Sequence, residues 1–439
     1  MSMSDKIIFY TSQNSNRLQY TINLIFHEIL GLNIVFTMSK NLYQESNLPK
    51  IHYGDIRLSD DEYFIKEHAL IFENYIIKRD FAKEFHEFDI FSKIFVLVSR
   101  YEEYIRDADS TEIASSRFDA HGRFNASASI ASELGFLQQP VVNQWVMEIK
   151  ESLLQHFPYL KIPPPQYKLQ LTYDIDQAWA FKNKGLLRNI GGFFTDLLNR
   201  RFKNAFDRLS VIVHLNNDPQ YTFDYIEKLH KKYEHKISEQ PVFFWLLGDY
   251  GKFDKNISWG NKSLQRLIRR MSKKYKMGIH PSYASNTGLN ILKMEIERLR
   301  KILKSDTEGV FLSRQHFLKL TFPNTYRNLI RVGIQSDYTM GYADNIGFRA
   351  GIATPFYWYD LGNEEVTNLK IYPFQVMEVT LKEYLKLSPD EVIAYVKPMI
   401  EATQAVGGTF TTLWHNSTLS ETEGYEGWRR VYHQILEEA

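Results

Sequence analysis

Residues 167–176 read Tyr-Lys-Leu-Gln-Leu-Thr-Tyr-Asp-Ile-Asp, a stretch that predicts a strand ending in two carboxylates, Asp174 and Asp176. Its apolar residues alternate, as they do in a strand with one buried face. Side chains at positions i and i+2 of a strand point the same way, with Cα atoms about 6–7 Å apart, so both acids would share one face. Two anions at that separation raise each other's pKa unless a cation lies between them or one keeps its proton. The pair therefore indicates a metal site or an acid–base pair, and the alternative is an Asp that caps the next helix.

Strand-like and helix-like segments alternate after this stretch. The predicted strands are 168–173, 241–247, 277–279, 309–313, 332–336, 370–376 and 409–414, and the predicted helices between them include 221–233, 263–275, 289–303 and 389–405. Repeated strand-then-helix units form parallel sheets. Seven strands without a clear switch point favour a distorted, incomplete TIM-like (β/α)7 barrel over the alternative, a doubly wound open sheet. The expected fold class is α/β, with the barrel preceded by a smaller α/β domain.

A proline-rich stretch, Lys161-Ile-Pro-Pro-Pro-Gln166, precedes the barrel. Three consecutive prolines disfavour both a helix and a central strand. We therefore expect a mixed α/β N-terminal domain of unknown function at residues 1–160, a linker at 161–166 and the barrel at 167–439. Within the first domain, a helical segment near 91–105 is expected to carry Arg100, Glu102 and Glu103 on a solvated face. Asp119, His121 and Arg123 fall in a predicted loop and are candidates for a surface between the domains.

The composition excludes several kinds of site and partner. The 439 residues include 53 Lys and Arg and 52 Asp and Glu, so the formal net charge is +1 and no overall field favours nucleic acid as a partner. The chain has no cysteine, which excludes disulfides, thiolate metal sites and a cysteine nucleophile, and leaves His and carboxylates as the strong metal ligands. The first residues lack the apolar stretch of an export signal, and no segment reaches the length of a membrane span, about 20 apolar residues. We therefore expect a cytoplasmic protein without a membrane span.

Reactive side chains stand where most of the predicted strands end. In barrels of parallel strands, catalytic residues lie at the carboxyl ends of the strands. The residues at or just beyond these ends are Asp174, Asp176, Asp249, His280, Arg314, His316, Asp337, Glu378 and His415. Taken singly, a His or Arg at such a position is more often a structural hydrogen-bond or ion-pair partner. Three His at separate strand ends favour a shared pocket instead.

Four short motifs at these strand ends resemble those of the polysaccharide deacetylase family, also known as the NodB-homology or carbohydrate esterase family 4 fold, which is a distorted barrel. They are Thr172-Tyr-Asp174-Ile-Asp176, Gly278-Ile-His280-Pro-Ser, Ser313-Arg314-Gln-His316-Phe and Leu413-Trp-His415. The resemblance implies that Asp174 is the general base, that Arg314 orients it and that His415 is the general acid. It also implies that Asp176 and His280 are metal ligands. Residues 1–160 resemble an uncharacterised domain that precedes this barrel in some bacterial surface-polysaccharide proteins.

The chain departs from the family pattern at the second motif. A second His normally follows the first by four positions, but that position is Ala284 here. We predict that His316 fills the vacancy, because it lies two residues after Arg314 on the adjacent strand and would point into the same mouth. Gln315 also stands where the family usually has proline. The predicted metal set is therefore Asp176, His280 and His316, with zinc as the first choice of divalent ion and cobalt, nickel or manganese as alternatives.

The activity that the resemblance implies is that of a metal-dependent hydrolase, a carbohydrate deacetylase, that removes an N-acetyl group from an acetamido sugar of a polysaccharide or its precursor. Four further residues are candidates for contacting the carbohydrate substrate: Asp337, Tyr342, Trp414 and Glu378.

Three alternatives remain open. Because of Ala284, the barrel is also compatible with a catalytically inactive module that binds a glycan or a partner. A metal-free glycoside hydrolase would use two carboxylates such as Asp176 and Glu378. In the third alternative, the protein is still a metal-dependent hydrolase, but the acyl group that it removes is attached through an O-ester bond.

Overall fold

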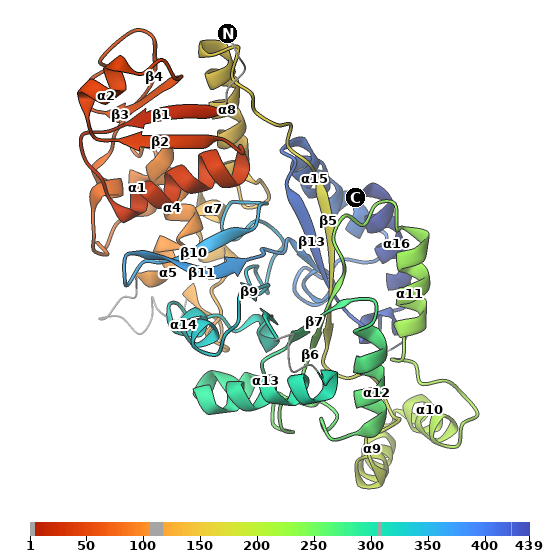
Figure 1. Ribbon diagram of the computed structural model, residues 1–439. Coiled ribbons are helices and arrows are strands. Elements are labelled where there is room, and N and C mark those ends of the chain that lie inside the picture. The colour runs from red at the N-terminus through yellow and green to blue at the C-terminus, as the bar shows by residue number, and fades with distance from the viewer. Residues whose placement is uncertain (1–4, 106–116, 305–309, 423) are drawn as a thin grey trace.

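The structure, a computed structural model, describes residues 5–105, 117–304, 310–422 and 424–439. It contains two separate sheets, one formed by strands before residue 67 and the other by strands after residue 167 (Figure 1). The predicted mixed α/β fold with parallel strands is confirmed. None of the helices in the described ranges combines the length and the apolar content that crossing a membrane requires.

The first sheet has four parallel strands in the order β2-β1-β3-β4. Their bounds are Lys6–Tyr10 for β1, Asn33–Thr37 for β2, Lys50–Gly54 for β3 and Glu62–Lys66 for β4. Alternate residues of β1 face opposite sides: Ile7 and Phe9 join the main apolar core, whereas Ile8 and Tyr10 pack on Tyr43. Helices accompany this sheet because parallel sheets bury both faces. They are α1 (Asn16–Ile22), the π-helix η1 (Asn23–Ile29), α2 (Lys40–Glu45), η2 (Ala69–Phe72), α3 (Phe81–Glu84), α4 (Ile90–Val98), α5 (Tyr101–Tyr104), η3 (Ala126–Ala128), α7 (Ile130–Glu133) and α8 (Val141–His156).

The second sheet has nine strands in the order β10-β11-β9-β8-β7-β6-β5-β13-β12. All neighbours are parallel except β10 and β11, which form an antiparallel pair. The strands are β5 (Lys168–Ile175), β6 (Val242–Trp245), β7 (Lys276–Ile279), β8 (Leu312–Ser313), β9 (Ser336–Asp337), β10 (Phe356–Asp360), β11 (Glu365–Ile371), β12 (Val376–Met377) and β13 (Thr409–His415). The predicted strand 309–313 is shorter than expected, and its first residue lies outside the described residues.

Helices and short helical turns connect the strands of the second sheet. They are α9 (Leu186–Leu198), α10 (Phe202–Ile212), α11 (Phe223–Lys232), α12 (Lys262–Met271), η4 (Tyr283–Thr287), α13 (Leu289–Leu303), η5 (His316–Leu318), α14 (Asn324–Arg331), the π-helix η6 (Thr380–Tyr384), α15 (Val392–Ala405), η7 (Ser417–Ser420) and α16 (Trp428–Glu438). In Figure 1, α9 and α10 project from the lower end of the molecule.

The predicted distorted, incomplete barrel of seven strands is not confirmed, because the sheet has nine strands and is not closed. The segment 370–376, predicted as one strand, is split: β11 ends at Ile371 and β12 begins at Val376, on different sides of an opening in the sheet. Pro373 lies between them, and proline cannot donate to a strand ladder. Four residues connect the two strands, so the gap between Ile371 and Val376 is at most about 18 Å. The sheet therefore curls, but β11 and β12 do not pair and the ladder stays open.

The two sheets share one apolar core. Buried residues of both parts of the chain form a single cluster. Hydrogen bonds cross between the parts, for example from the Tyr20 hydroxyl to the carbonyl of Tyr357 (2.7 Å) and from the amide of Val142 to the carbonyl of Gly351 (2.9 Å). Residues before the proline-rich stretch 161–166 are therefore packed against the second sheet.

The expected solvated face at Arg100, Glu102 and Glu103 is wrong, because all three side chains are buried. Glu103 accepts a hydrogen bond from Arg100 Nε (2.7 Å) and another from Nη2 of Arg349 (2.6 Å), which comes from the second part of the chain. Glu102 accepts from Arg100 Nη2 (2.7 Å). Two arginines thus balance two glutamates, and burial of charge is tolerated only with such pairing.

Candidate metal centre

The residues predicted at the strand ends come from neighbouring strands of the second sheet. Asp174 of β5 is paired in register with His415 of β13, and Ile279 of β7 is paired with Ser313 of β8. Parallel strands present their carboxyl ends at one edge, so the side chains that follow them meet there. A cavity of about 290 Å³ opens at this edge. Its lining residues are Arg123, Asp174, Asp176, His280, His316, Phe317, Leu318, Met377, Val379, Tyr384, His415, Ser417, Thr418 and Tyr425.

Asp176, His280 and His316 form a cluster with the donor set of a divalent-metal site. One atom from each lies within 4.8 Å of the others, and this is the single such His and carboxylate group in the described ranges. His280 Nε2 lies 3.4 Å from Asp176 Oδ1, and His316 Nε2 lies 3.7 Å from Asp176 Oδ2. Asp176 Oδ1 is buried and accepts no well-formed hydrogen bond from any described residue. A buried carboxylate oxygen without a donor is costly, and a cation would satisfy it.

The far side of each imidazole is anchored, as is usual for metal-binding His. His280 Nδ1 lies 2.6 Å from the carbonyl oxygen of Arg314. Because a carbonyl only accepts, Nδ1 carries the proton, and Nε2 faces Asp176. His316 Nδ1 lies 2.8 Å from Asp254 Oδ1. One carboxylate and two imidazoles held in this way can bind a divalent ion and leave positions open.

Asp254 is a site residue that the sequence did not reveal. The strand-end candidate was Asp249, but that side chain is exposed and pairs with Arg298 (2.8 Å). Asp254, in the loop after β6, is buried and accepts hydrogen bonds from the amides of Tyr283 (2.8 Å) and Ala284 (3.2 Å). The backbone amide of Ala284 therefore helps to hold the carboxylate that anchors His316.

The charged groups of the cluster shift the pKa values of Asp176 and His316 in opposite directions. Burial acts to raise the pKa of Asp176, but His316, His280 and His415 hold that pKa well below its ordinary value. Burial acts to lower the pKa of His316, but Asp176 and Asp254 raise it to about 9. The imidazolium of His316 is therefore stable at neutral pH between two carboxylates.

Metal affinity is expected to depend steeply on pH. Since the pKa of His316 is raised to about 9 and His316 binds metal only when neutral, a proton must leave as the metal enters below that pH. The apparent affinity for Zn²⁺ should rise about tenfold per pH unit between roughly pH 7 and 9, and level off above. Isothermal titration calorimetry in buffers of different ionisation enthalpy should show about one proton released per metal at neutral pH. An affinity that stays constant across this interval would contradict the predicted role of His316.

Asp174 lies beside the cluster and is held by a buried arginine. Arg314 Nη1 donates to Asp174 Oδ1 (3.0 Å), and His280 Nε2 lies 3.6 Å from the other oxygen, Oδ2. Arg314 is fixed by two more hydrogen bonds, from Nη2 to the hydroxyl of Thr172 (2.7 Å) and from Nε to the carbonyl of Tyr338 (2.9 Å). A permanently charged, immobile guanidinium keeps Asp174 in one orientation.

His415 faces the cluster from the other side. Its Nδ1 lies 2.7 Å from Glu378 Oε1, and its Nε2 lies 3.9 Å from Asp176 Oδ2. Burial acts to lower the pKa of His415, but Glu378, Asp176 and Asp174 raise it to about 10. His415 is therefore protonated at neutral pH, with Nε2 on the side of the carboxylates.

The structure places all four predicted substrate contacts outside the lining of the cavity. Two of them are buried carboxylates with partners of their own. Glu378 is bonded to His415 and to the Thr418 hydroxyl (2.9 Å). Asp337 accepts a hydrogen bond from the Ser313 hydroxyl (2.7 Å). These carboxylates therefore support neighbouring residues of the sheet edge.

The other two predicted contacts are aromatic residues of the apolar interior. Trp414 alternates with His415 along β13, so its ring points to the opposite face and stacks on Tyr432. Tyr342 packs against Phe124 and other apolar residues of the N-terminal part. Both rings therefore contribute to packing.

Part of the cavity wall comes from residues before the proline-rich stretch 161–166. Arg123 donates from Nη2 to the Tyr384 hydroxyl (2.8 Å) and from Nε to Asp119 (2.6 Å). It therefore lies at the contact between the two parts of the chain and also lines the cavity. The rings of Tyr384, Tyr425 and Phe317 line the same cavity. They were not identified from the sequence, because they lie in short helical turns and a loop outside the predicted strands and helices.

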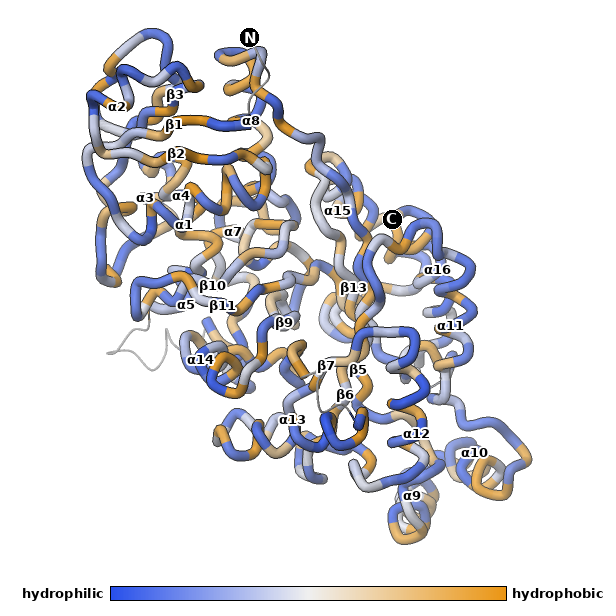
Figure 2. Tube along the Cα trace, in the orientation of Figure 1, coloured by the Kyte–Doolittle hydropathy of each residue, from blue (hydrophilic) through white to orange (hydrophobic). Residues whose placement is uncertain are grey.

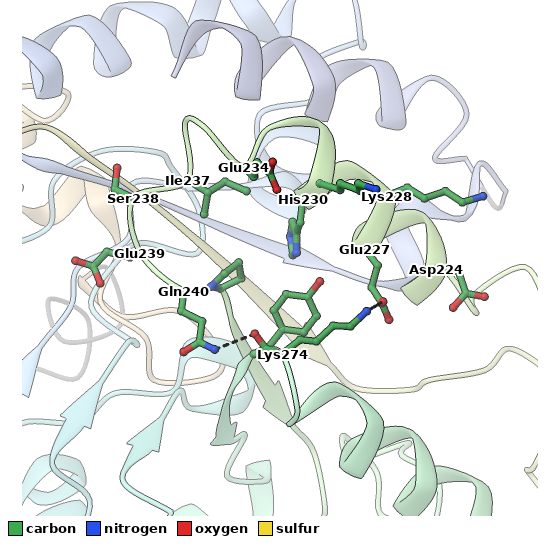
Figure 3. Close-up of a pocket in the computed structure, with 13 residues that line it drawn as sticks. Asp224, Glu227, Lys228, His230, Glu234, Ile237, Ser238, Glu239, Gln240 and Lys274 are labelled. Atoms are coloured by element: carbon green, nitrogen blue, oxygen red, sulfur yellow. Dashed lines mark hydrogen bonds and ion pairs between the residues drawn. The ribbon is translucent and has the colours of Figure 1, made fainter.

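A second, larger hollow of about 660 Å³ lies at the opposite edge of the sheet, before β6 and β7 (Figure 3). Charged groups around it pair with one another, as Lys274 does with Glu227. His230 lines it and is bonded to the Tyr173 hydroxyl (2.7 Å), and burial lowers its pKa to about 3, so it stays neutral. In the part of the chain that the structure describes, this hollow has no cluster of metal-binding residues.

In the comparisons with known proteins, one family model matches the first part of the chain. Residues 7–158 match DUF7033, a family of unknown function. No curated protein sequence matches the chain. Among solved structures, a protein described as a polysaccharide deacetylase from Mycobacterium smegmatis has a TM-score of 0.40 and 12% identity, over 62% of this chain and 85% of that one. The PuuE allantoinase has a TM-score of 0.38 and 10% identity, over 63% of this chain and 88% of that one. Likenesses at this level do not bear on activity.

Proposed function

We propose that this protein is a divalent-metal-dependent hydrolase that removes an N-acetyl group from an acetamido sugar. The observation that supports it best is the grouping of Asp176, His280 and His316 within 4.8 Å at the cavity. Asp174 with Arg314 flanks this cluster, and so does His415 with Glu378. The carbohydrate substrate is inferred from the resemblance of the four motifs to polysaccharide deacetylases.

The side chains around the cluster suit the proton transfers of amide hydrolysis. When bound, the divalent ion supplies Lewis-acid activation of water and of the acyl carbonyl. Asp174 accepts the proton of the attacking water at Oδ2, because Arg314 occupies Oδ1. His415 then donates the Nε2 proton to the departing amine, which leaves poorly unless it is protonated.

The position of His415 suits protonation of a departing amine, because Glu378 holds Nδ1 and leaves Nε2 on the side of the carboxylates. The position of Glu378 argues against the two-carboxylate glycosidase. Its Oε1 accepts hydrogen bonds from His415 and Thr418, and it does not line the cavity.

Acetate release from N-acetylglucosamine oligomers tests the proposal. Purified protein loaded with Zn²⁺ or Co²⁺ should release acetate without new reducing ends, and a chelator should remove the activity and lower the melting temperature. Readdition of the metal should restore both. Reducing ends without acetate would indicate a glycosidase. Absence of bound metal, together with a melting temperature that a chelator leaves unchanged, would indicate the inactive binding module.

A further inference from the structure

Two adjacent helices, α9 and α10, carry many of the exposed apolar side chains of this protein. Of the 23 large apolar side chains that are exposed among the described residues, 12 lie between residues 186 and 215. We call residues 186–215 the helical hairpin. Leu187 and Leu198 are 87% and 85% exposed, and Figure 2 shows apolar segments on both helices where they project from the body. Large exposed apolar patches mark surfaces that interact with another protein or with a membrane.

Polar side chains of the hairpin lie at the contact between α9 and α10. Between α9 and α10, Asp196 pairs with Arg208 (2.8 Å), and both side chains are largely buried. The Arg208 guanidinium lies against Gly192, where a Cβ would come within 2.6 Å of it. A helix pair that is stable in water normally places its apolar stripes against each other. Here apolar side chains such as Phe202 and Phe206 on α10 are exposed.

Positive charge surrounds these apolar side chains. The helical hairpin, residues 186–215, contains five Lys and Arg and two Asp, a formal net charge of +3. Since the whole chain has a net charge of +1, the remaining residues together carry −2. Arg200 and Arg201 are exposed at the turn between the helices, close in sequence to Leu198 and Phe202. The partner that fits this surface is therefore apolar and negatively charged.

We infer that the helical hairpin docks onto the surface of an anionic phospholipid bilayer, with α9 and α10 lying in the plane of the interface. Amphipathic helices with Phe and Leu on one side and Lys and Arg at its border bind in this way. With its 13 residues, α9 is about 20 Å long, which is too short to span a bilayer. A second copy of the chain fits less well, because two such surfaces would bring like charges together.

The position of the hairpin determines how the docked protein would be oriented on the bilayer. It follows β5, the strand that carries Asp174, so the chain enters it from the same edge of the sheet as the cavity. A docked protein would therefore hold this edge near the lipid surface. Docking depends on the exposure and charge of the hairpin, and does not require the proposed hydrolase activity.

Flotation with vesicles tests the docking. The full-length protein should float with vesicles of phosphatidylcholine plus phosphatidylglycerol, less so at high salt, and much less with phosphatidylcholine alone. The double substitution Leu187→Ser with Leu198→Ser should reduce partitioning about tenfold or more, and so should Arg200→Glu with Arg201→Glu. Ile56→Ser, at a residue that is 73% exposed in the N-terminal part, is the matched control and should leave partitioning unchanged. Because all these side chains are exposed, the melting temperatures should stay close to that of the wild type.

Three results would overturn the inference. The first is no flotation of the wild-type protein with anionic vesicles. The second is flotation that both hairpin variants retain in full. The third is a concentration-dependent dimer, without flotation, that the double serine variant dissociates, since a second copy would then cover the hairpin.

Discussion

The Asp174→Asn variant is expected to lose about 10²–10⁴-fold in turnover while it keeps its metal. Asparagine has nearly the same shape and can still accept a hydrogen bond from Arg314, but its amide cannot take a proton from water. Asp174 lies outside the group of Asp176, His280 and His316, so metal content should stay at the wild-type value. The measurements are acetate release at saturating substrate and metal analysis of the purified variant.

The control for this variant is Asp249→Asn, which makes the same chemical change at an exposed side chain that pairs with Arg298. It should leave turnover and metal content unchanged. A melting curve of each variant separates loss of the base from loss of folding, because Arg314 is buried and loses a charged partner in Asp174→Asn. Full activity of Asp174→Asn would show that another group is the base.

The His316→Ala variant is expected to lose both metal and activity. Removal of one of three ligands should weaken metal binding by more than about a hundredfold. The Asp254→Asn variant changes only the residue that anchors His316, and its expected loss is smaller, about 10–100-fold. Both can be measured by competition with a fluorescent chelator. We expect the larger loss for His316→Ala because His316 Nε2 faces Asp176 in the proposed metal site, whereas Asp254 contacts only Nδ1.

His86→Ala is the control for a general effect of removing an imidazole, because His86 is exposed in the N-terminal part. It should bind metal like the wild type. If His316→Ala retained stoichiometric metal with unchanged affinity, His316 would be a structural residue, and the metal set would need another third ligand.

The strands that could be predicted are those whose pattern is long and regular. The predicted strand at 168–173 corresponds to β5, and the one at 409–414 corresponds to β13. The split of 370–376 was missed because the residues on both sides of Pro373 are apolar, and sequence pattern does not show which neighbour a strand will pair with. The strand β10 was also missed, although its aromatic residues favour a strand.

Sequence order was informative for the site because parallel strands end at a common edge. This brought Asp176, His280 and His316 into one hypothesis, and the structure places them together, while their role as ligands stays a prediction. Loops carry no comparable periodicity, so the sequence could not single out Asp254. The alternation of side chains could have excluded Trp414, since its neighbour His415 was already directed to the cavity.

The buried ion pair between Arg349 and Glu103 has a consequence for how this protein can evolve or be dissected. Residues 1–160 cannot be exchanged like an independent accessory module, because their removal would leave Arg349 without Glu103 and uncover apolar residues of the common core. It would also take Arg123 from the cavity wall. A change on one side of this contact is therefore expected to need a matching change on the other side.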